Sequence, residues 1–260
     1  TNTAVTGIPK PTLTSLPTGD IVVVETDLIR AVIDSYGGDL RRLELLTYPE
    51  KLENPDEPFR LLNEEGADLF VIQGGLLGTQ GELPNHHTRY VADQHNYYLS
   101  PAADRVEAIL RWQSPDGVGY RKVYTFYRNS YYIDIRYDID NATATAWQGF
   151  QYNQILRTKV EQESSGFGFL GRLPSYTGGV IYTPEDKYQK IDFDDMYDEN
   201  LARSTPSGWV AMLQHYFVGA LLPRGSSAYE FYSTVTARDS QPHYHIGYKS
   251  VEPTVVPAGR

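Results

Sequence analysis

The sequence predicts an all-β fold, built as a sandwich or a barrel. Short segments in which apolar and polar residues alternate recur along the chain, and Gly, Pro, Asn and Asp separate many of them. No segment keeps a helical apolar stripe over several turns. The 21 tyrosines fit this prediction, because aromatic side chains pack well on the pleated surface of a strand.

Regular structure is expected to begin near Asp20. Residues 1–19 are rich in Thr, Pro and Gly and show no apolar period, which is typical of a flexible tether. Strands are expected next at residues 21–24, 28–33 and 40–46, and a Gly-containing turn at 36–39 separates the second from the third.

The clearest alternation lies in the middle of the chain. Residues 106–112, 120–126 and 131–139 each place mainly apolar side chains on one face, and turn signals at 114–117 and 128–130 separate them. The other face of the third segment carries Asp134, Arg136, Asp138 and Asp140. These three segments predict an antiparallel meander with one wet face, which argues against a paired-carboxylate glycosidase centre.

Five further strands are expected, at residues 148–158, 180–182, 209–222, 230–236 and 243–251. Neither a repeat of fixed period nor a low-complexity segment divides residues 20–260. All-β domains reach about 250 residues without dividing, so one β-sandwich domain over residues 20–260 is predicted.

Composition excludes several classes of protein. The formal net charge of −10 disfavours a nonspecific binder of nucleic acid. The absence of cysteine excludes disulfides, thiolate metal sites and cysteine nucleophiles. The longest apolar runs are far shorter than the roughly 20 residues that a membrane-spanning helix needs.

Residues 207–217, SGWVAMLQHYF, gather Trp209, His215 and Phe217 and raise the question of an active site. Alternation places these three side chains on one face, while both faces are largely apolar. That pattern is typical of a central strand covered on both sides. His215 is therefore interpreted as a histidine at the edge of the core with a hydrogen-bond partner.

Two histidine pairs are candidate ligands or acid–base groups. His243 and His245 share one face of a predicted strand, roughly 6.6 Å apart along it, but no third ligand lies nearby in the sequence. They are interpreted as solvated or locally hydrogen-bonded. His86 and His87 lie in the polar stretch ELPNHHTRY and are expected on the surface of a loop.

Two other motifs are weak. The acidic run DFDDMYDE offers hard oxygen ligands but lacks the central glycine and spaced glutamate of a calcium loop; its acidic residues are Asp192, Asp194, Asp195, Asp198 and Glu199. GGLLGTQG, residues 74–81, lacks the Gly-Lys-Ser/Thr and the helix of a phosphate loop. The acidic run is expected to be a solvated charged loop, and the glycine-rich run a flexible loop. No Gly-x-Ser-x-Gly occurs, and neither a catalytic, a cofactor nor a metal site is predicted.

Several fragments, taken in order, resemble the large periplasmic domain of the YidC family of bacterial membrane-protein insertases. They are VVVETDLIRAVIDSYGGDLRRLELLTYP, DKYQKIDFDD, GWVAMLQHYFVGALLP, IGYKS and VVPAG. The resemblance covers about Asp20 to Arg260 and implies a large twisted antiparallel β-sandwich of the galactose-mutarotase type. It also implies that residues 1–19 are the tether that follows the first membrane helix.

The resemblance further implies a location at the periplasmic face of the Gram-negative inner membrane. It implies a noncatalytic accessory role in membrane-protein insertion and folding, with the Sec translocon subunits SecD and SecF, and nascent membrane proteins, as partners. Two alternatives stay open: a module that accepts a peptide or a glycan in its cleft, and an enzyme like the aldose epimerases. Fold similarity alone does not transfer that activity.

Overall fold

The computed structural model describes residues 16–65, 68–78, 81–159, 176–214, 216–225, 228–237 and 241–260. This part of the chain forms three β-sheets and one short helix, α1 (Phe193–Asp198), which confirms the all-β prediction. No described helix is long and apolar enough to cross a membrane. Residues 1–15 of the predicted tether lie outside the described ranges, as does His215.

The large sheet has eleven described strands. Its order is β14 (Ala202–Thr205), β17 (Tyr229–Thr236), β18 (His243–Ser250), β11 (Trp147–Thr158), β5 (Phe70–Leu77), β3 (Asp39–Lys51), β2 (Ile29–Asp34), β1 (Ile21–Glu25) and β7 (Asn96–Tyr98), with β4 (Asn54–Leu62) beside β3 and β19 (Thr254–Val256) beside β11. Strand β7 joins β1 in parallel, whereas the neighbouring pair β1–β2 is antiparallel.

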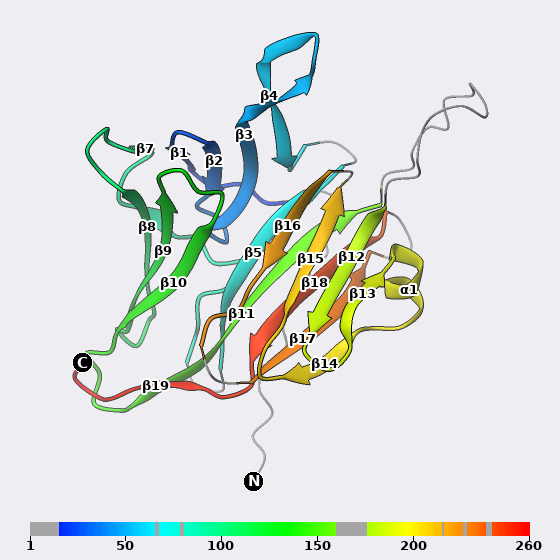
Figure 1. Cartoon of the computed structure of the whole chain (residues 1–260). Helices are drawn as coiled ribbons and strands as arrows, with labels where there is room; N and C mark the ends of the chain where they lie inside the picture. The colour runs from blue at the N-terminus through cyan, green and yellow to red at the C-terminus, as the bar shows by residue number, and fades with distance from the viewer. Residues whose placement is uncertain are drawn as a thin grey trace.

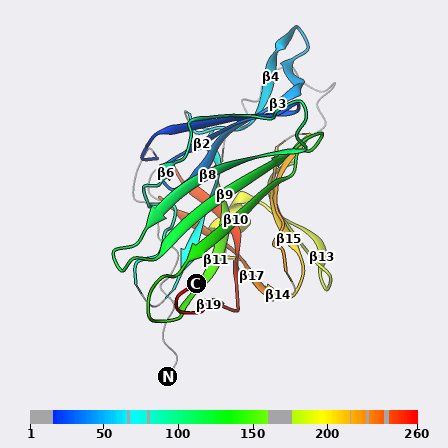
Figure 2. The same ribbon diagram turned by 90° about the vertical axis from the view of Figure 1, so that its left-hand side faces the viewer.

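Two four-stranded sheets lie side by side in front of the large sheet in Figure 1. One has the order β10 (Ile133–Asp140), β9 (Gly119–Tyr127), β8 (Arg105–Gln113) and β6 (Val91–Ala92). The other has the order β13 (Lys187–Ile191), β12 (Thr177–Thr183), β15 (Trp209–Gln214) and β16 (Phe217–Leu221). Figure 2 views the molecule from the side of β8, β9 and β10.

One hydrophobic core joins the three sheets. Val24 of the large sheet, Leu110 and Phe126 of the β8–β9 pair, and Val210 and Met212 of β15 are at most 1% exposed and belong to the same packed cluster. Burying apolar side chains of this size stabilises the fold by about 1.5–3 kcal/mol each. The sandwich is therefore one large sheet covered on one face by two smaller ones.

The predicted meander is confirmed as β8, β9 and β10. Val106 pairs with Phe126, and Phe126 pairs with Ile133, so the three strands are antiparallel neighbours as the alternation requires. The third strand begins at Ile133, two residues later than predicted. The inward face of β9 is buried, including Tyr124 and Phe126.

The single strand predicted over residues 209–222 is wrong. The segment forms a hairpin, in which Gln214 pairs with Phe217 and Val210 pairs with Leu221. No Gly, Pro, Asn or Asp lies between Gln214 and Phe217, so the sequence contains no ordinary turn signal there. Trp209 and Phe217 consequently lie on different strands, and the interpretation of His215 concerns a residue outside the described ranges.

The acidic run is a helix rather than a loop. The side chain of Asp192 accepts hydrogen bonds from the backbone N–H groups of Asp194 and Asp195, and the Asp195 side chain accepts one from the backbone of Asp192. This reciprocal capping box starts α1. Phe193 and Met196, three residues apart on one face of the helix, are buried and hold α1 against the large sheet.

The glycine-rich run is also more ordered than predicted. Gly74 and Gly75 lie within β5. A Cβ atom at Gly75 would lie 2.5 Å from the Cα of Asn85, so glycine permits the loop that carries Asn85 to approach the strand closely. Residues 79 and 80 of the run lie outside the described ranges.

Candidate functional site

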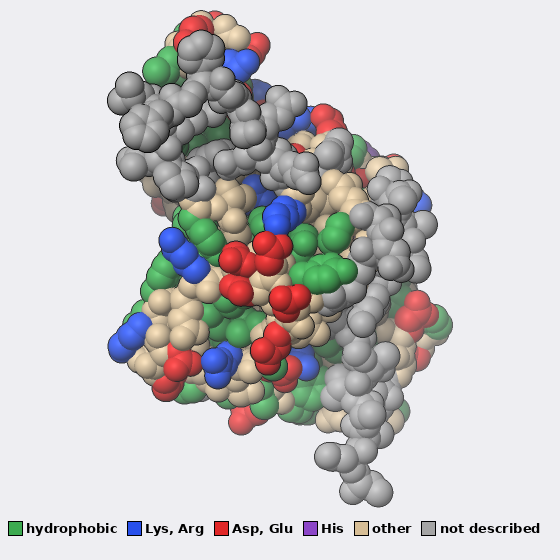
Figure 3. All heavy atoms as spheres, turned by 90° about the vertical axis from the view of Figure 1, so that its right-hand side faces the viewer, with side chains coloured by type: hydrophobic (Ala, Val, Ile, Leu, Met, Phe, Trp, Pro, Cys, Tyr) green, Lys and Arg blue, Asp and Glu red, His purple; other side chains and the backbone are tan. Residues whose placement is uncertain are grey.

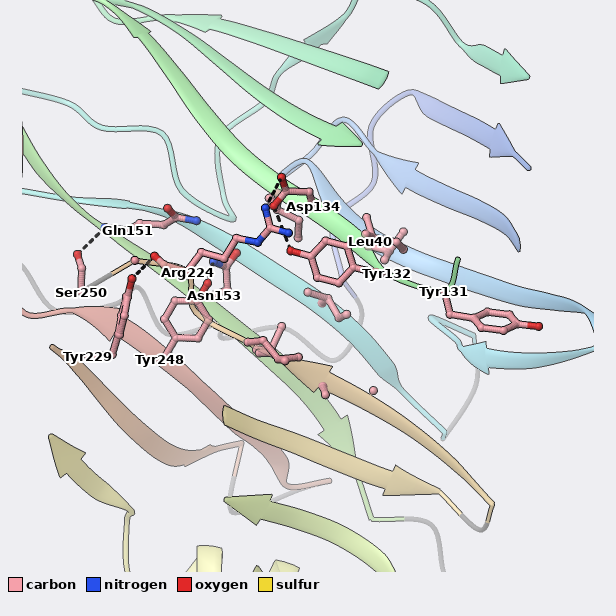
Figure 4. Close-up of a pocket in the computed structure, with 18 of the residues that line it drawn as sticks. Leu40, Tyr131, Tyr132, Asp134, Gln151, Asn153, Arg224, Tyr229, Tyr248 and Ser250 are labelled. Atoms are coloured by element: carbon pink, nitrogen blue, oxygen red, sulfur yellow. Dashed lines mark hydrogen bonds and ion pairs between the residues drawn. The ribbon is translucent and has the colours of Figure 1, made fainter. Parts of the chain in front are cut away.

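A cavity of about 500 Å³ lies between β10 and β16 and is called the cleft below (Figure 4). One wall consists of residues 131–135 at and before the start of β10, and the other consists of residues 218–222 in and after β16. The floor comes from β3, β4, β5, β11 and β18 of the large sheet. Its volume is in the range of pockets that hold a small molecule or a short peptide segment.

The floor of the cleft is apolar at one end and polar at the other. Leu40, Leu62 and Ile72 line the apolar part, and the first two are each 1% exposed. Asn153 and Ser250 lie toward the polar part, close to the loop that follows β16 (Figure 4). The lining thus combines buried aliphatic surface with a few polar groups, as ligand pockets usually do.

Arg224, in the loop after β16, reaches across the cleft to β10 (Figure 4). Its Nη1 atom lies 3.4 Å from Oδ2 of Asp134, and its guanidinium carbon lies 4.8 Å from the centre of the Tyr132 ring. The Tyr229 hydroxyl donates to the Arg224 carbonyl oxygen and so holds the backbone of the loop. Because the Arg224 side chain is 65% exposed, we expect this ion pair to contribute little to stability and to open readily.

Aromatic rings pack around Phe217 at the start of β16. The Phe217 ring stacks on Phe59 of β4 with a centroid separation of 4.0 Å, and Tyr48 of β3 meets Phe217 edge-on at 5.5 Å. Tyr48 also lies 6.3 Å from Tyr131, whose hydroxyl is 2.7 Å from the hydroxyl of Thr47. These contacts fix the projecting β3–β4 hairpin against both walls of the cleft.

A group of buried charged residues lies outside the cleft lining. The Asp39 carboxylate accepts a hydrogen bond from Gln73 at 2.9 Å and lies 3.4 Å from Nη2 of Arg41. Lys122 of β9 donates to the carbonyl oxygens of Gly37 and Gly74 at 3.1 and 3.2 Å. Asp39, Arg41 and Lys122 are all fully buried.

Burial shifts the pKa values of Asp39 and Lys122 so that the uncharged form of each group is favoured. It raises the pKa of Asp39 to about 6, while Arg41 and Lys122 oppose the rise. It lowers the pKa of Lys122 to about 8, against the opposing effect of Asp39. Perturbed pairs often mark active sites, but this pair does not line the cleft. Lys122 binds backbone groups of β5 and the β2–β3 turn, and Asp39 binds the side chains of Gln73 and Arg41. We therefore interpret it as a structural cross-link between sheets.

This buried charged cluster was not predicted from the sequence. A signal was present in β9, where Lys122 interrupts an apolar face formed by Tyr120, Tyr124 and Phe126. Lysine is almost never fully buried unless it has a partner, so its position on the inward face was informative. Arg41 gave no comparable signal, because it lies next to Arg42 in an ordinary polar alternation.

His243 and His245 were expected to be solvated or locally hydrogen-bonded; solvation is wrong for both, and a local hydrogen bond is confirmed for His245. They are 6% and 1% exposed, and Nε2 of His245 lies 3.1 Å from the Thr236 hydroxyl. Burial lowers the pKa of His243, and it lowers that of His245 to about 3 with His243 adding to the effect. Strand β18 is covered on both faces, which the sequence alternation alone did not reveal.

His86 and His87 lie in a loop, as predicted, but the expectation of a surface position is wrong for His86. Nδ1 of His86 lies 2.5 Å from the Tyr152 hydroxyl, and the His86 ring is only 2% exposed. His87 is half-buried, and burial lowers its pKa. Neither pair of histidines lines the cleft, and the two pairs have separate polar neighbours.

The outer face of the meander is confirmed to face solvent. Arg136 lies 3.1 Å from Glu107 and 3.2 Å from Asp138, and the hydrogen bond from Arg136 lowers the pKa of Glu107. Asp140 is exposed. Asp134 differs, because it turns into the cleft and pairs with Arg224.

Acidic side chains gather on the face that carries α1 (Figure 3). Asp194 forms an ion pair with Lys159 at 2.7 Å, and Asp192 and Asp195 are used in capping. Across the ranges that the structure describes, no three His, Asp or Glu side chains are arranged to hold a metal ion.

Comparison with known proteins identifies relatives over nearly the whole chain. The model of the YidC periplasmic domain family matches residues 21–260. The "Membrane protein insertase YidC" of Methylococcus capsulatus is 41% identical over 238 residues, which are 91% of this chain and 42% of the relative. That of Nitrosospira multiformis is 38% identical over 234 residues, 89% of this chain and 40% of the relative. The chain thus spans about two fifths of the length of these relatives.

A solved structure shares the fold without close sequence similarity. The galactose mutarotase related enzyme from Lactobacillus acidophilus aligns with a TM-score of 0.50 at 9% sequence identity, covering 92% of this chain and 93% of that one. This similarity supports the predicted galactose-mutarotase type of sandwich. At this level of identity it concerns the fold alone.

Proposed function

The chain belongs to the family of YidC periplasmic domains, and from this premise we propose that it serves a membrane-protein insertase as a noncatalytic periplasmic domain. In this role it assists insertion and folding of inner-membrane proteins from the periplasmic face of the membrane. It does so by docking to SecD and SecF, the accessory subunits of the Sec translocon.

The observation that supports a binding role over a catalytic one is the composition of the cleft. Mutarotase chemistry needs a general base and a general acid that converge on the substrate. Of the two carboxylates in the described lining, that of Asp134 is paired with Arg224 and the other belongs to Glu252, and the described lining contains no histidine. A cleft with a partly apolar floor and an exposed ion pair across it suits binding better than proton transfer.

A second candidate function has direct support from the same cavity. An open space of about 500 Å³ with aliphatic and amide side chains is suited to a short peptide or glycan. In that case the domain binds a ligand directly, and docking to the translocon is a separate property of its surface.

A pull-down with the immobilised chain tests the docking role. Detergent-solubilised inner membranes are passed over the chain, and retained SecD and SecF are quantified by immunoblot. We expect both subunits to be retained and to be displaced by an excess of the free chain. Retention equal to that on an unrelated immobilised β-sandwich would contradict docking.

A further inference from the structure

Two strands present an unpaired edge to the cleft. Among the described strands, β10 pairs only with β9, and β16 pairs only with β15. Residues of both strands line the same cavity, so the two edges face it from opposite sides. Free backbone N–H and C=O groups at a sheet edge can pair with any extended chain that reaches them.

The two edges differ in how they are protected. Strand β10 carries Asp134, Arg136 and Asp138, and charged side chains are a common device that prevents a sheet edge from pairing. Strand β16 has the sequence FVGAL, with neither a charge nor a proline. Its Val218 and the following Leu222 are 52% and 53% exposed. Only the β16 edge is therefore open and chemically suited to accept another strand.

The cleft limits what can pair with β16. The aromatic contacts of Phe217 with Phe59 and Tyr48 cover the start of the strand, and within residues 218–222 the exposed positions are Val218, Ala220 and Leu222. Five residues of extended chain span about 17 Å. A strand that belongs to a folded sheet brings its own neighbours with it, and β10 and the floor leave no room for them. The space suits one isolated extended segment.

We propose that β16 binds an extended, uncharged polypeptide segment of about five residues as an added strand inside the cleft. This inference rests on the proposed function of the domain as a binding domain of an insertase, and it names the class of ligand. Backbone pairing with β16 supplies affinity that does not depend on sequence. Alternate side chains of the segment point to Ile72, Ile133 and Ile135, the partly exposed isoleucines of the lining, which select aliphatic residues.

A labelled peptide tests the proposal directly. Fluorescein-labelled Thr-Val-Thr-Val-Thr-Val with an amidated C-terminus is titrated with the chain, and anisotropy is recorded. We expect saturable binding. Two N-methylated forms of the peptide, each blocking one set of alternate amides, keep the side chains but remove the donors of one peptide edge. At least one form is expected to bind tenfold more weakly, and equal binding of all three peptides would overturn strand addition.

Matched variants locate the site. Val218→Lys places a charge on the open edge and is expected to weaken binding at least tenfold. Val91→Lys changes another exposed valine, 71% exposed on the edge strand β6 and outside the cleft lining, and is expected to stay within twofold of the parent chain. Circular dichroism checks that both variants are folded. An equal loss in both, or in neither, would contradict binding at β16.

The remaining outcomes identify other occupants. Saturable binding of maltohexaose without binding of the peptide would replace the polypeptide with a glycan. A dimer in sedimentation equilibrium that Val218→Lys dissociates would replace it with a second copy of the chain. The peptide titrations report only on the cleft, whereas the pull-down reports on retention of the native SecD and SecF. Failure of strand addition can therefore be distinguished from failure of docking.

Discussion

Lys122 is stable in the interior because backbone carbonyl oxygens replace the water around its ammonium group and the charge of Asp39 favours its protonated form. Its ammonium group donates to two carbonyl oxygens, and its alkyl chain lies against Gly38. The rings of Tyr90 and Tyr124 lie about 6 Å from the same group, at 6.0 and 5.6 Å. A buried charge of this kind contributes little net stability but is costly to leave unpaired.

Lys122→Met is therefore expected to destabilise the fold by about 3 kcal/mol, because it leaves two buried carbonyl oxygens without their donor and removes a positive charge that favours the ionised form of Asp39. Urea unfolding measures the effect. Lys51→Met, at an exposed position in β3, is the control and is expected to change the free energy of unfolding by less than about 0.5 kcal/mol. Equal effects of the two substitutions would show that Lys122 is not a structural cross-link.

His245 gives the fold a dependence on pH. Its pKa is lowered from 6.5 to about 3 by burial, so between these values the unfolded chain binds a proton that the folded chain does not. The free energy of unfolding therefore falls as the pH falls through this window. His245→Gln removes the titrating group, and between pH 7 and pH 4 the parent chain is expected to lose up to about 3 kcal/mol more than the variant.

Urea unfolding at several pH values measures this difference. Asp39, whose raised pKa gives the opposite slope between about pH 4 and 6, is present in both proteins and cancels in the comparison. His95→Gln, at an exposed position, is the control and is expected to follow the parent chain. Parallel curves for the parent chain and His245→Gln would show that His245 is not buried as a neutral group.

At the scale of elements, short-range hydrogen bonds decide where α1 begins. Its six residues are too few for a stable isolated helix, so the capping box and two buried side chains must fix it. Asp192→Ala removes the acceptor for two backbone donors and is expected to destabilise the fold by about 1 kcal/mol in urea unfolding. Asp198→Ala, at the other end of α1, removes an acidic residue from the negative end of the helix dipole and is expected to be neutral or slightly stabilising. A larger loss in Asp198→Ala would contradict the capping role.

At the scale of the whole molecule, the sandwich leaves a cleft where its two small sheets do not meet. Arg224 and Asp134, which bridge this cleft, lie 90 residues apart in sequence. The floor of the cleft is formed by strands of the large sheet, so the cleft exists only once all three sheets have assembled. Its lining supports ligand binding and contains no convergent acid–base pair among the described residues.

A mutarotation assay is accordingly expected to show no activity. Polarimetry of freshly dissolved α-D-galactose in the presence of the chain is expected to give the rate of buffer alone, while an authentic mutarotase as control accelerates the change. The physical reason is that Asp134 is paired and His86, His243 and His245 are buried away from the cleft. A rate that rises in proportion to the concentration of the chain would contradict a noncatalytic domain.

The all-β class and the meander could be predicted from the sequence because alternation is a local property of each strand. The hairpin at residues 214–217 could not, because the segment lacks turn residues and alternates as one strand would. Burial of His86 and His245 depends on which parts of the fold pack over them. Alternation shows on which face of a strand a side chain lies, but it does not show whether another layer buries that face. The cleft could not be predicted either, because its walls come from residues 131–135 and 218–222, which are far apart in the sequence and become neighbours only in the folded chain.

The most direct test of the central proposal compares the full-length insertase with a form that lacks residues 20–260. Both are crosslinked in inner membranes and purified, and the recovered SecD and SecF are quantified against the insertase. If the domain docks to SecD and SecF, recovery of both subunits is expected to fall at least tenfold when the domain is removed. Unchanged recovery, with equal amounts of insertase in the membrane, would contradict the proposal.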